Sequence, residues 1–434
     1  MRKAASIAAL LLGAGAVAAA DSEPSIEVHA QATYLRQSKP LFHSPYSGPN
    51  SLGAARAYSY SFTSTLYLSA RLGSGWEAYL NPEFTRGIPF SELKGTAGFT
   101  NGELARTSGS TLRGYTARAF VRKTWNLGGE WEDQASDANQ VATRYAAERV
   151  VLTAGTMSVL DLFDAVDYSR DARTQFMNWS SLTYGAWDFA ADARGYTKGL
   201  ALEYISPGWS LRAGRFAMPV ESNGLRLDGR IAQRHGDMAE LEFPFKGLAR
   251  GGVLRFLAFR NQAEMGAFRD ALALSAATGN APDLAQVRRL QSKKGIGAGA
   301  QIELTENVGA YVRAAVNDGG TETFAFTEID RSLSFGALVK GAAWRRERDS
   351  AGIVVYVNGL RAPHRDYLAA GGLGFFLGDG RLSYGNERIL ETFYSLGLMK
   401  GAWLSLGYQR IANPGYNRDR GPADFLGFRL HAEI

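Results

Sequence analysis

AYSYSFTSTLYLSARL, residues 57–72, alternates between apolar and polar side chains. Tyr58 and Leu66 belong to one face of this pattern, and Ser59 and Thr63 belong to the other. A period of two residues is typical of a β-strand with one apolar and one polar face. Strands of soluble sheets usually have about five or six residues, whereas a tilted strand needs about 9–11 to cross a membrane. The stretch therefore predicts a membrane-spanning β-strand, with Tyr58 at the aromatic interface.

The same alternation recurs along the chain. In residues 115–127 it assigns Tyr115 to the apolar face and Arg118 and Arg122 to the polar face. The other alternating stretches are residues 76–85, 196–204, 296–304, 308–316 and 426–434. Repeated long strands of this kind predict an all-β protein, specifically a transmembrane antiparallel β-barrel. A soluble secreted sandwich or β-helix also alternates, but it does not need long strands throughout.

The connections between these stretches are of two lengths. Short turns include residues 73–75, 206–208, 305–307 and 400–401. Long polar segments cover residues 37–55, 87–112, 159–195, 219–235, 262–294, 317–331, 361–387 and 412–423. Short turns on one side and long extracellular loops on the other are typical of outer-membrane barrels. Eight long loops with both termini on the short-turn side predict sixteen strands, although residues 128–148 and 340–350 are long for short turns.

Two long segments have helical composition. Residues 161–168 and 265–277 are expected to form short loop helices, with Asp161 and Asn261 as candidate caps. No composition change marks a domain boundary, so residues 21–434 are expected to form a single barrel domain.

The N-terminus predicts export. Arg2 and Lys3 precede an apolar run that ends in Ala18-Ala19-Ala20, and this pattern indicates a cleaved signal peptide over residues 1–20. A membrane-spanning helix is the alternative, but the run is short for a span. The chain has no Cys and a formal net charge of +6, without a basic run. Thiol chemistry is therefore excluded and a nucleic-acid partner is not expected, whereas the bacterial outer membrane and its lipid are.

Several sequence segments resemble those of the carbohydrate-selective outer-membrane porin family (OprB-like). They are VHAQATY (28–34), SPYSGPNSL (44–52), LTAG (152–155), RTQFMNW (173–179), AADARGY (190–196) and YQRIANPGYNRDRGP (408–422). The resemblance implies a sixteen-stranded barrel that passes glucose and related mono- or oligosaccharides by diffusion. It favours a monomer over a trimer. Because the family also includes porins for other small solutes, a different solute remains the alternative.

Charged and aromatic side chains are the candidates for the solute path. Opposed charges across a narrow lumen offer fixed hydrogen-bond partners to hydroxyl groups, and aromatic faces pack against sugar C–H groups. The longest segment, 159–195, is expected to fold into the barrel and form the constriction. The alternative is that these charges only pair with one another and that the tryptophan packs against the wall. The candidates are Glu83, Arg86, Arg118, Arg122, Asp164, Arg173, Trp179 and Arg194.

Other functions have weaker support in the sequence. A barrel hydrolase needs a nucleophile beside a histidine. His29 and His431 are expected on neighbouring first and last strands, near Glu433, without a nucleophile motif. No cofactor or metal motif occurs, so no cofactor is expected. A structural barrel without conductance would be expected to carry long, repetitive loops, which this chain lacks.

Overall fold

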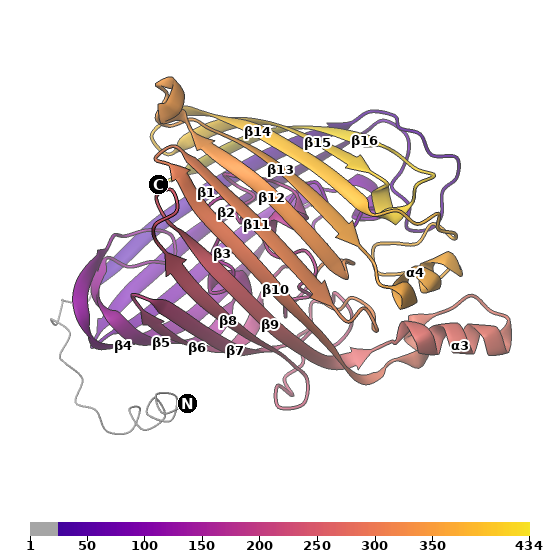
Figure 1. Ribbon diagram of the computed structural model, residues 1–434, viewed down its shortest axis with the longest axis horizontal. Coiled ribbons are helices and arrows are strands. Elements are labelled where there is room, and N and C mark those ends of the chain that lie inside the picture. Colours follow the sequence, from indigo (N-terminus) through magenta and orange to yellow (C-terminus); the bar gives the residue numbers. More distant parts are fainter. Residues whose placement is uncertain (1–24) are drawn as a thin grey trace.

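The computed structural model describes residues 25–434, and its sixteen antiparallel strands close into one barrel (Figure 1). The predicted fold class and strand number are therefore confirmed. The predicted signal peptide, residues 1–20, lies outside the described residues. The strands are β1 (Ser25–Lys39), β2 (Ala57–Gly73), β3 (Trp76–Ile88), β4 (Arg113–Gln134), β5 (Thr143–Met157), β6 (Thr197–Ser206), β7 (Trp209–Ala217), β8 (His235–Phe245), β9 (Gly252–Met265), β10 (Arg289–Thr305), β11 (Val308–Asn317), β12 (Arg331–Lys340), β13 (Ser350–Gly359), β14 (Glu387–Met399), β15 (Ala402–Ala412) and β16 (Ala423–Glu433).

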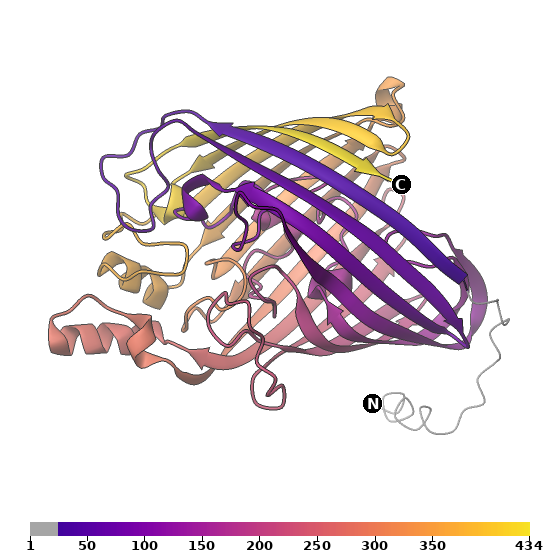
Figure 2. The same ribbon diagram turned by 180° about the vertical axis from the view of Figure 1, so that it is seen from behind.

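Every strand pairs with its neighbours in the chain, and β1 pairs with β16 to close the wall (Figure 2). The closing register runs from Gln31 opposite Glu433 to Ser38 opposite Leu426. Closure leaves no sheet edge unpaired, which is the condition for strands to cross a membrane.

Short and long connections alternate, and the start of β1 and the end of β16 lie on the short-turn side. Residues 128–148 did not fit a short turn because β4 and β5 continue through most of them as a long hairpin. Residues 340–350 contain the 3-10 turn η4 (Gly341–Trp344). By the usual orientation of such barrels, the long segments face the cell exterior.

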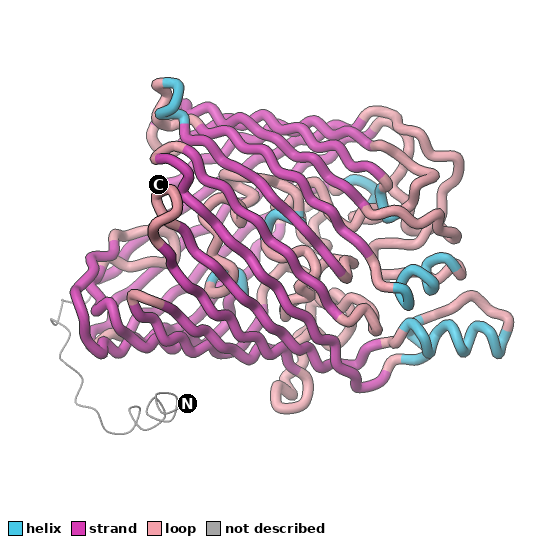
Figure 3. The backbone as a smooth tube through the Cα atoms, viewed as in Figure 1, coloured by secondary structure: helices cyan, strands magenta, loops and turns pink. Residues whose placement is uncertain are grey.

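Helices are short, and strand forms nearly all of the wall (Figure 3). They are η1 (Phe90–Glu92), η2 (Val159–Asp161), α2 (Trp179–Leu182), α3 (Phe268–Thr278), η3 (Leu284–Val287), η4, α4 (Ala362–Ala369) and η5 (Pro414–Tyr416). Among residues 25–434, none of these helices is long and apolar enough to span a membrane.

One of the two predicted loop helices forms. The helix expected over 265–277 is α3, but its N-cap is Ala267, and Asn261 lies inside β9. The helix expected over 161–168 does not form; only η2 is present there. Asp161 instead accepts two hydrogen bonds from the guanidinium of Arg118, so its side chain is fixed by a tertiary contact as well as by the turn.

The alternation of β2 separates the lumen from the membrane face. Tyr58 is 56% exposed on the outer face, whereas Thr65 on the polar face is 1% exposed. Outward apolar side chains on the neighbouring strand β3, such as Phe84 and Leu80, continue this surface. The polar faces predicted from the sequence therefore line the interior, as expected for a barrel whose outer surface contacts lipid.

A bulge in β4 changes the phase of its alternation. Asn81 of β3 pairs with Arg118, but the next residue, Pro82, pairs with Thr116, so Ala117 is the extra residue. A β-bulge inserts one residue on one strand only, which shifts the side chains beyond it to the other face. The assignment of Tyr115 to the apolar face was therefore wrong: Tyr115 pairs with Glu83 and faces the lumen beside it.

Candidate solute path

Two cavities inside the barrel meet at the guanidinium groups of Arg118 and Arg173. The larger, about 1170 Å³, opens toward the short turns and is also lined by His29 and Trp403. The smaller, about 170 Å³, is lined largely by residues of the long segments. Since Arg118 and Arg173 line both cavities, they lie between the two.

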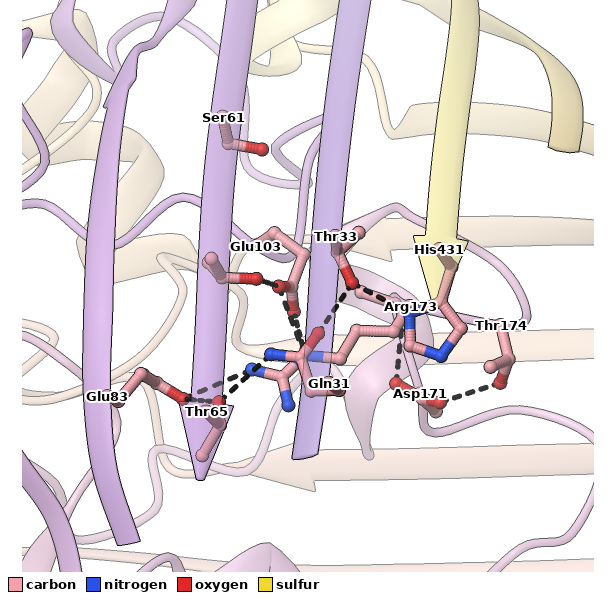
Figure 4. Close-up of polar contacts among 12 residues, drawn as sticks. Gln31, Thr33, Ser61, Thr65, Glu83, Glu103, Asp171, Arg173, Thr174 and His431 are labelled. Atoms are coloured by element: carbon pink, nitrogen blue, oxygen red, sulfur yellow. Dashed lines mark hydrogen bonds and ion pairs between the residues drawn. The ribbon is translucent and has the colours of Figure 1, made fainter. Parts of the chain in front are cut away.

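Arg173 is the centre of a charged network (Figure 4). Its Nε donates to both carboxylate oxygens of Glu103 at 3.1 Å, and its Nη2 lies 3.2 Å from Glu83. Its Nη1 donates to the hydroxyl of Tyr67 at 2.8 Å. Arg173 comes from the segment between β5 and β6, whereas Tyr67 and Glu83 belong to β2 and β3. One side chain of a long segment is thus bonded to the inward faces of two adjacent wall strands and to Glu103 of a second long segment.

Glu83 receives hydrogen bonds from several directions. Thr65 donates at 2.7 Å and Tyr196 at 3.2 Å, and Tyr115 donates as well. Together with Arg173, these groups fill the acceptor positions of one carboxylate. The carboxylate and its hydroxyl and guanidinium donors therefore hold one another in place.

Arg118 is held from the opposite side. Its Nε and Nη2 donate to the two carboxylate oxygens of Asp161, each at 2.7 Å, in the bidentate geometry that favours planar guanidinium groups. The Tyr196 ring lies 5.2 Å from its guanidinium carbon, within cation–π distance. Arg194 contacts the ring of Tyr115 in the same way, at 4.3 Å.

The charges of the loop groups persist at neutral pH. Burial by itself lowers the pKa of the Arg173 guanidinium, but Glu103, Tyr67 and Glu83 raise it well above its ordinary value. Burial raises the pKa of Asp171, but the hydrogen bond from Thr174 and the charge of Arg173 lower it below its ordinary value. Both groups are therefore ionised, and the network carries opposite charges that largely cancel.

The segment between β5 and β6 is bonded to the wall through its backbone. Glu391 of β14 accepts from the amides of Met177 and Asn178, at 2.6 and 3.1 Å. Arg429 of β16 donates to the carbonyl oxygens of Ala172 and Gln175, at 2.7 and 2.8 Å. Buried polar side chains need such partners, because a buried polar group without a hydrogen bond costs a few kcal/mol.

Two further pairs extend this anchoring. Arg313 of β11 lies 2.9 Å from Asp164 and donates to the carbonyl of Ser169 at 2.7 Å. Lys293 of β10 lies 3.2 Å from Asp188. The segment is thus attached to strands β10, β11, β14 and β16 on one side and, through Arg173, to β2 and β3 on the other.

The structure brings four of the candidates together. Glu83, Arg118, Arg173 and Arg194 line the smaller cavity as one cluster. Trp179 also borders this cavity, but it is nearly buried: its ring stacks on Phe326 at 5.8 Å, and its indole N–H donates to the carbonyl of Asn101 at 2.9 Å.

The other three candidates lie elsewhere. Asp164 is paired with Arg313 and lines neither cavity. Arg122 faces Glu77, 3.4 Å away, nearer the short turns. Arg86 is on the outward face of β3 with Phe84 and Ile88.

Sequence reasoning missed several members of the cluster. Tyr196 and Tyr67 belonged to alternating stretches, but nothing in the pattern distinguished them from other tyrosines. Glu103 lies in a long segment without a regular period. Tyr115 was placed on the wrong face because a bulge has no signature in the alternation itself. His29 and His431 lie on the paired strands β1 and β16, as expected. His431 contacts Glu433 at 3.2 Å, also as expected, whereas His29 bonds to Ser136 at 2.8 Å.

Comparisons with known proteins agree with this architecture. The family model described as the carbohydrate-selective porin, OprB family, matches residues 50–433. No curated protein matches the sequence. The barrel is similar to OprB of Pseudomonas putida at high pH, with 14% identity, 94% of each chain covered and a TM-score of 0.67. It is also similar to the outer-membrane channel DcaP of Acinetobacter baumannii, with 7% identity, 96% of this chain and 100% of that one covered, and a TM-score of 0.52.

Proposed function

Since the chain belongs to the OprB family of carbohydrate-selective porins, we propose that it lets glucose and related mono- or oligosaccharides diffuse passively through its lumen. The coarser function follows from the family: the protein is an outer-membrane porin, a channel and not an enzyme. We also propose that the segment between β5 and β6 folds inward and forms the narrowest part of the path. The observation that carries this proposal is that Arg173 of this segment, together with Arg118, lines both cavities.

The chemistry of the cluster suits a neutral polyhydroxylated solute. The smaller cavity is lined by equal numbers of formal charges of each sign, so it offers little net charge to attract an ion strongly. The acids are Glu83, Glu103 and Asp192, and the bases are Arg118, Arg173 and Arg194. The guanidinium, carboxylate and tyrosine groups nevertheless present fixed donors and acceptors, with which sugar hydroxyls can exchange hydrogen bonds as they shed water. Because conduction requires release, this binding should be weak.

The remaining features of the proposal concern processing and assembly. Residues 1–20 would be removed as a signal peptide during export, and residues 21–434 would form one barrel domain in contact with outer-membrane lipid. A monomer is sufficient, because both cavities are lined by residues of one chain.

Single-channel conductance in planar bilayers tests the proposal directly. Refolded protein is inserted, and glucose, a disaccharide and a neutral amino acid are titrated separately. We expect stable openings that glucose reduces partially and saturably, whereas the amino acid leaves them unchanged. Openings that respond to none of the sugars would leave a porin for another small solute. Folded protein without any conductance would favour a barrel without transport.

A further inference from the structure

Basic side chains gather on the outer wall at the long-segment end of β6 to β10. Lys198, Arg215, Arg260 and Lys294 lie on outward faces there, and the acids among them are Asp237 and Asp318. These strands follow one another around the barrel, and β8, β9 and β10 lie side by side in Figure 1. Four cations therefore face two carboxylates at the end of the barrel that carries the long segments.

The positive charge is concentrated at Arg260 and Lys294. These two residues are directly opposite each other in the pairing of β9 with β10. Like charges at opposed positions destabilise a sheet unless a counter-charge is present. Asp237 lies opposite Arg260, but both of its carboxylate oxygens are occupied by Arg215, at 2.7 and 2.8 Å.

The nearest other acid, Asp318, lies beside Lys294 but forms no ion pair with its side chain. Within residues 25–434, neither Arg260 nor Lys294 forms an ion pair; Arg260 donates to the neutral Gln262 at 2.7 Å. The carboxylate of Asp318 accepts from the backbone amide of Lys294, not from its ammonium group. An anion is thus the missing partner of two adjacent cations.

An apolar groove of about 580 Å³ runs along the outer wall just below these cations. Ala258 and Ile296, two residues before Arg260 and two after Lys294 on the same outward faces, line it. Phe256, which is 49% exposed, and Leu241 form another part of its lining. The groove and the cations together match a molecule with an anionic head and a hydrocarbon chain.

We propose that this surface binds a phosphorylated lipid of the outer leaflet, with the phosphate between Arg260 and Lys294 and an acyl chain in the groove. Guanidinium and ammonium groups are the usual protein partners of phosphate, and such contacts are charge-assisted. Cations at a membrane surface strengthen the binding of anionic lipid. The inference concerns the outer wall and is independent of the solute that passes through the lumen.

A second copy of the chain is a less suitable occupant. In a two-fold assembly about this groove, the same surface of each subunit would face the other. The unbalanced cations of both copies would then be brought together, which opposes association. The positive charge of Arg260 and Lys294 beside the groove therefore favours lipid over a second copy of the chain.

The test uses the full chain purified in detergent and native mass spectrometry. The added ligands are a bisphosphorylated acylated disaccharide lipid, the same lipid without phosphates, and inorganic pyrophosphate. The variant R260Q/K294Q removes the cations. The matched control K246Q/R250Q removes the same charge from the short turn between β8 and β9, at the opposite end of the same part of the wall. A third variant, Ala298→Phe, fills the groove and keeps the cations. Heat-modified gel mobility establishes that each variant is folded.

We expect the wild type and K246Q/R250Q to retain the bisphosphorylated lipid alike. R260Q/K294Q should bind it roughly 30-fold more weakly, from the contribution of two cations at a membrane surface. Ala298→Phe should also weaken it, and pyrophosphate should compete poorly because it lacks the acyl chains.

Three results would overturn the proposal. The first is equal retention of phosphorylated and dephosphorylated lipid. The second is unchanged binding by folded R260Q/K294Q. The third is a wild-type oligomer that Ala298→Phe dissociates without any change in lipid binding, which would assign the groove to a second copy.

Discussion

Substitution of Arg173 by Gln should convert the passage into a cation-selective one. The change removes the positive charge between Glu83 and Glu103, which lie 3.2 and 3.1 Å from the guanidinium nitrogens. A monovalent cation at the vacated position would be about 4 Å from each carboxylate. At that distance one unit charge contributes about 1 kcal/mol in water, so two contribute about 2 kcal/mol. This corresponds to roughly 30-fold local enrichment of cations.

The assay is the reversal potential across a tenfold KCl gradient at pH 8. Because exposed charges are screened over about 10 Å at 0.1 M salt and about 3 Å at 1 M, the shift toward cation selectivity should be large at low salt and small at 1 M. Arg122→Gln is the matched control, since Arg122 lines neither cavity. R173K should restore the wild-type value.

A folded R173Q channel with the reversal potential of the wild type at 0.1 M would refute the reasoning. Ions would then pass without contacting this network, and the passage at Arg118 and Arg173 would not be the one that solutes use.

Three further predictions concern Tyr196, Trp179 and His364. Tyr196→Phe removes a donor to Glu83 and keeps the ring beside the neighbouring guanidinium, so the glucose concentration for half-maximal block should rise about two- to fivefold. Trp179→Ala opens a cavity in a buried aromatic cluster and should lower the free energy of unfolding in urea by about 3–5 kcal/mol; an unchanged urea midpoint would mean that the ring contributes little packing. Burial lowers the pKa of His364 in α4, but Asp330 raises it more, to about 9 against the ordinary 6.5. The contact therefore stabilises α4 fully below about pH 6.5, and this stabilisation is lost as the pH rises through 9. Hydrogen exchange of residues 362–369, corrected for intrinsic rates, should accelerate from pH 7 to 10. His364→Gln should abolish this pH dependence.

The alternation of the sequence located seven of the wall strands, and the number of strands followed from the eight long loops. Residues 57–72 coincide with β2 almost residue for residue, because membrane and lumen impose opposite polarity on successive side chains. The eight long segments were also located, since turn and loop compositions differ sharply from those of strands. Helix 161–168 was wrong because local composition does not include the tertiary bond between Asp161 and Arg118.

The path was predicted only in part, for a physical reason. Strand periodicity assigns a side chain to the lumen or the membrane, so Glu83 and Arg118 could be identified as lumenal. It does not say which lumenal residues meet across the barrel, because that depends on the fold of the long segments. Arg173 was chosen from the longest of them, but its partner Glu103 lies in another segment, about seventy positions away in the chain.

The seam between β1 and β16 also constrains how the protein assembles. Thr33 and His431 bond across it although they are 398 positions apart in the chain. Pairing of such distant residues is slow, because a large loop entropy must be lost before any contact forms. Until β16 reaches β1, the chain is an open sheet with two unpaired edges, which are templates for aggregation. Export of this protein therefore requires that both edges be shielded throughout the interval before closure.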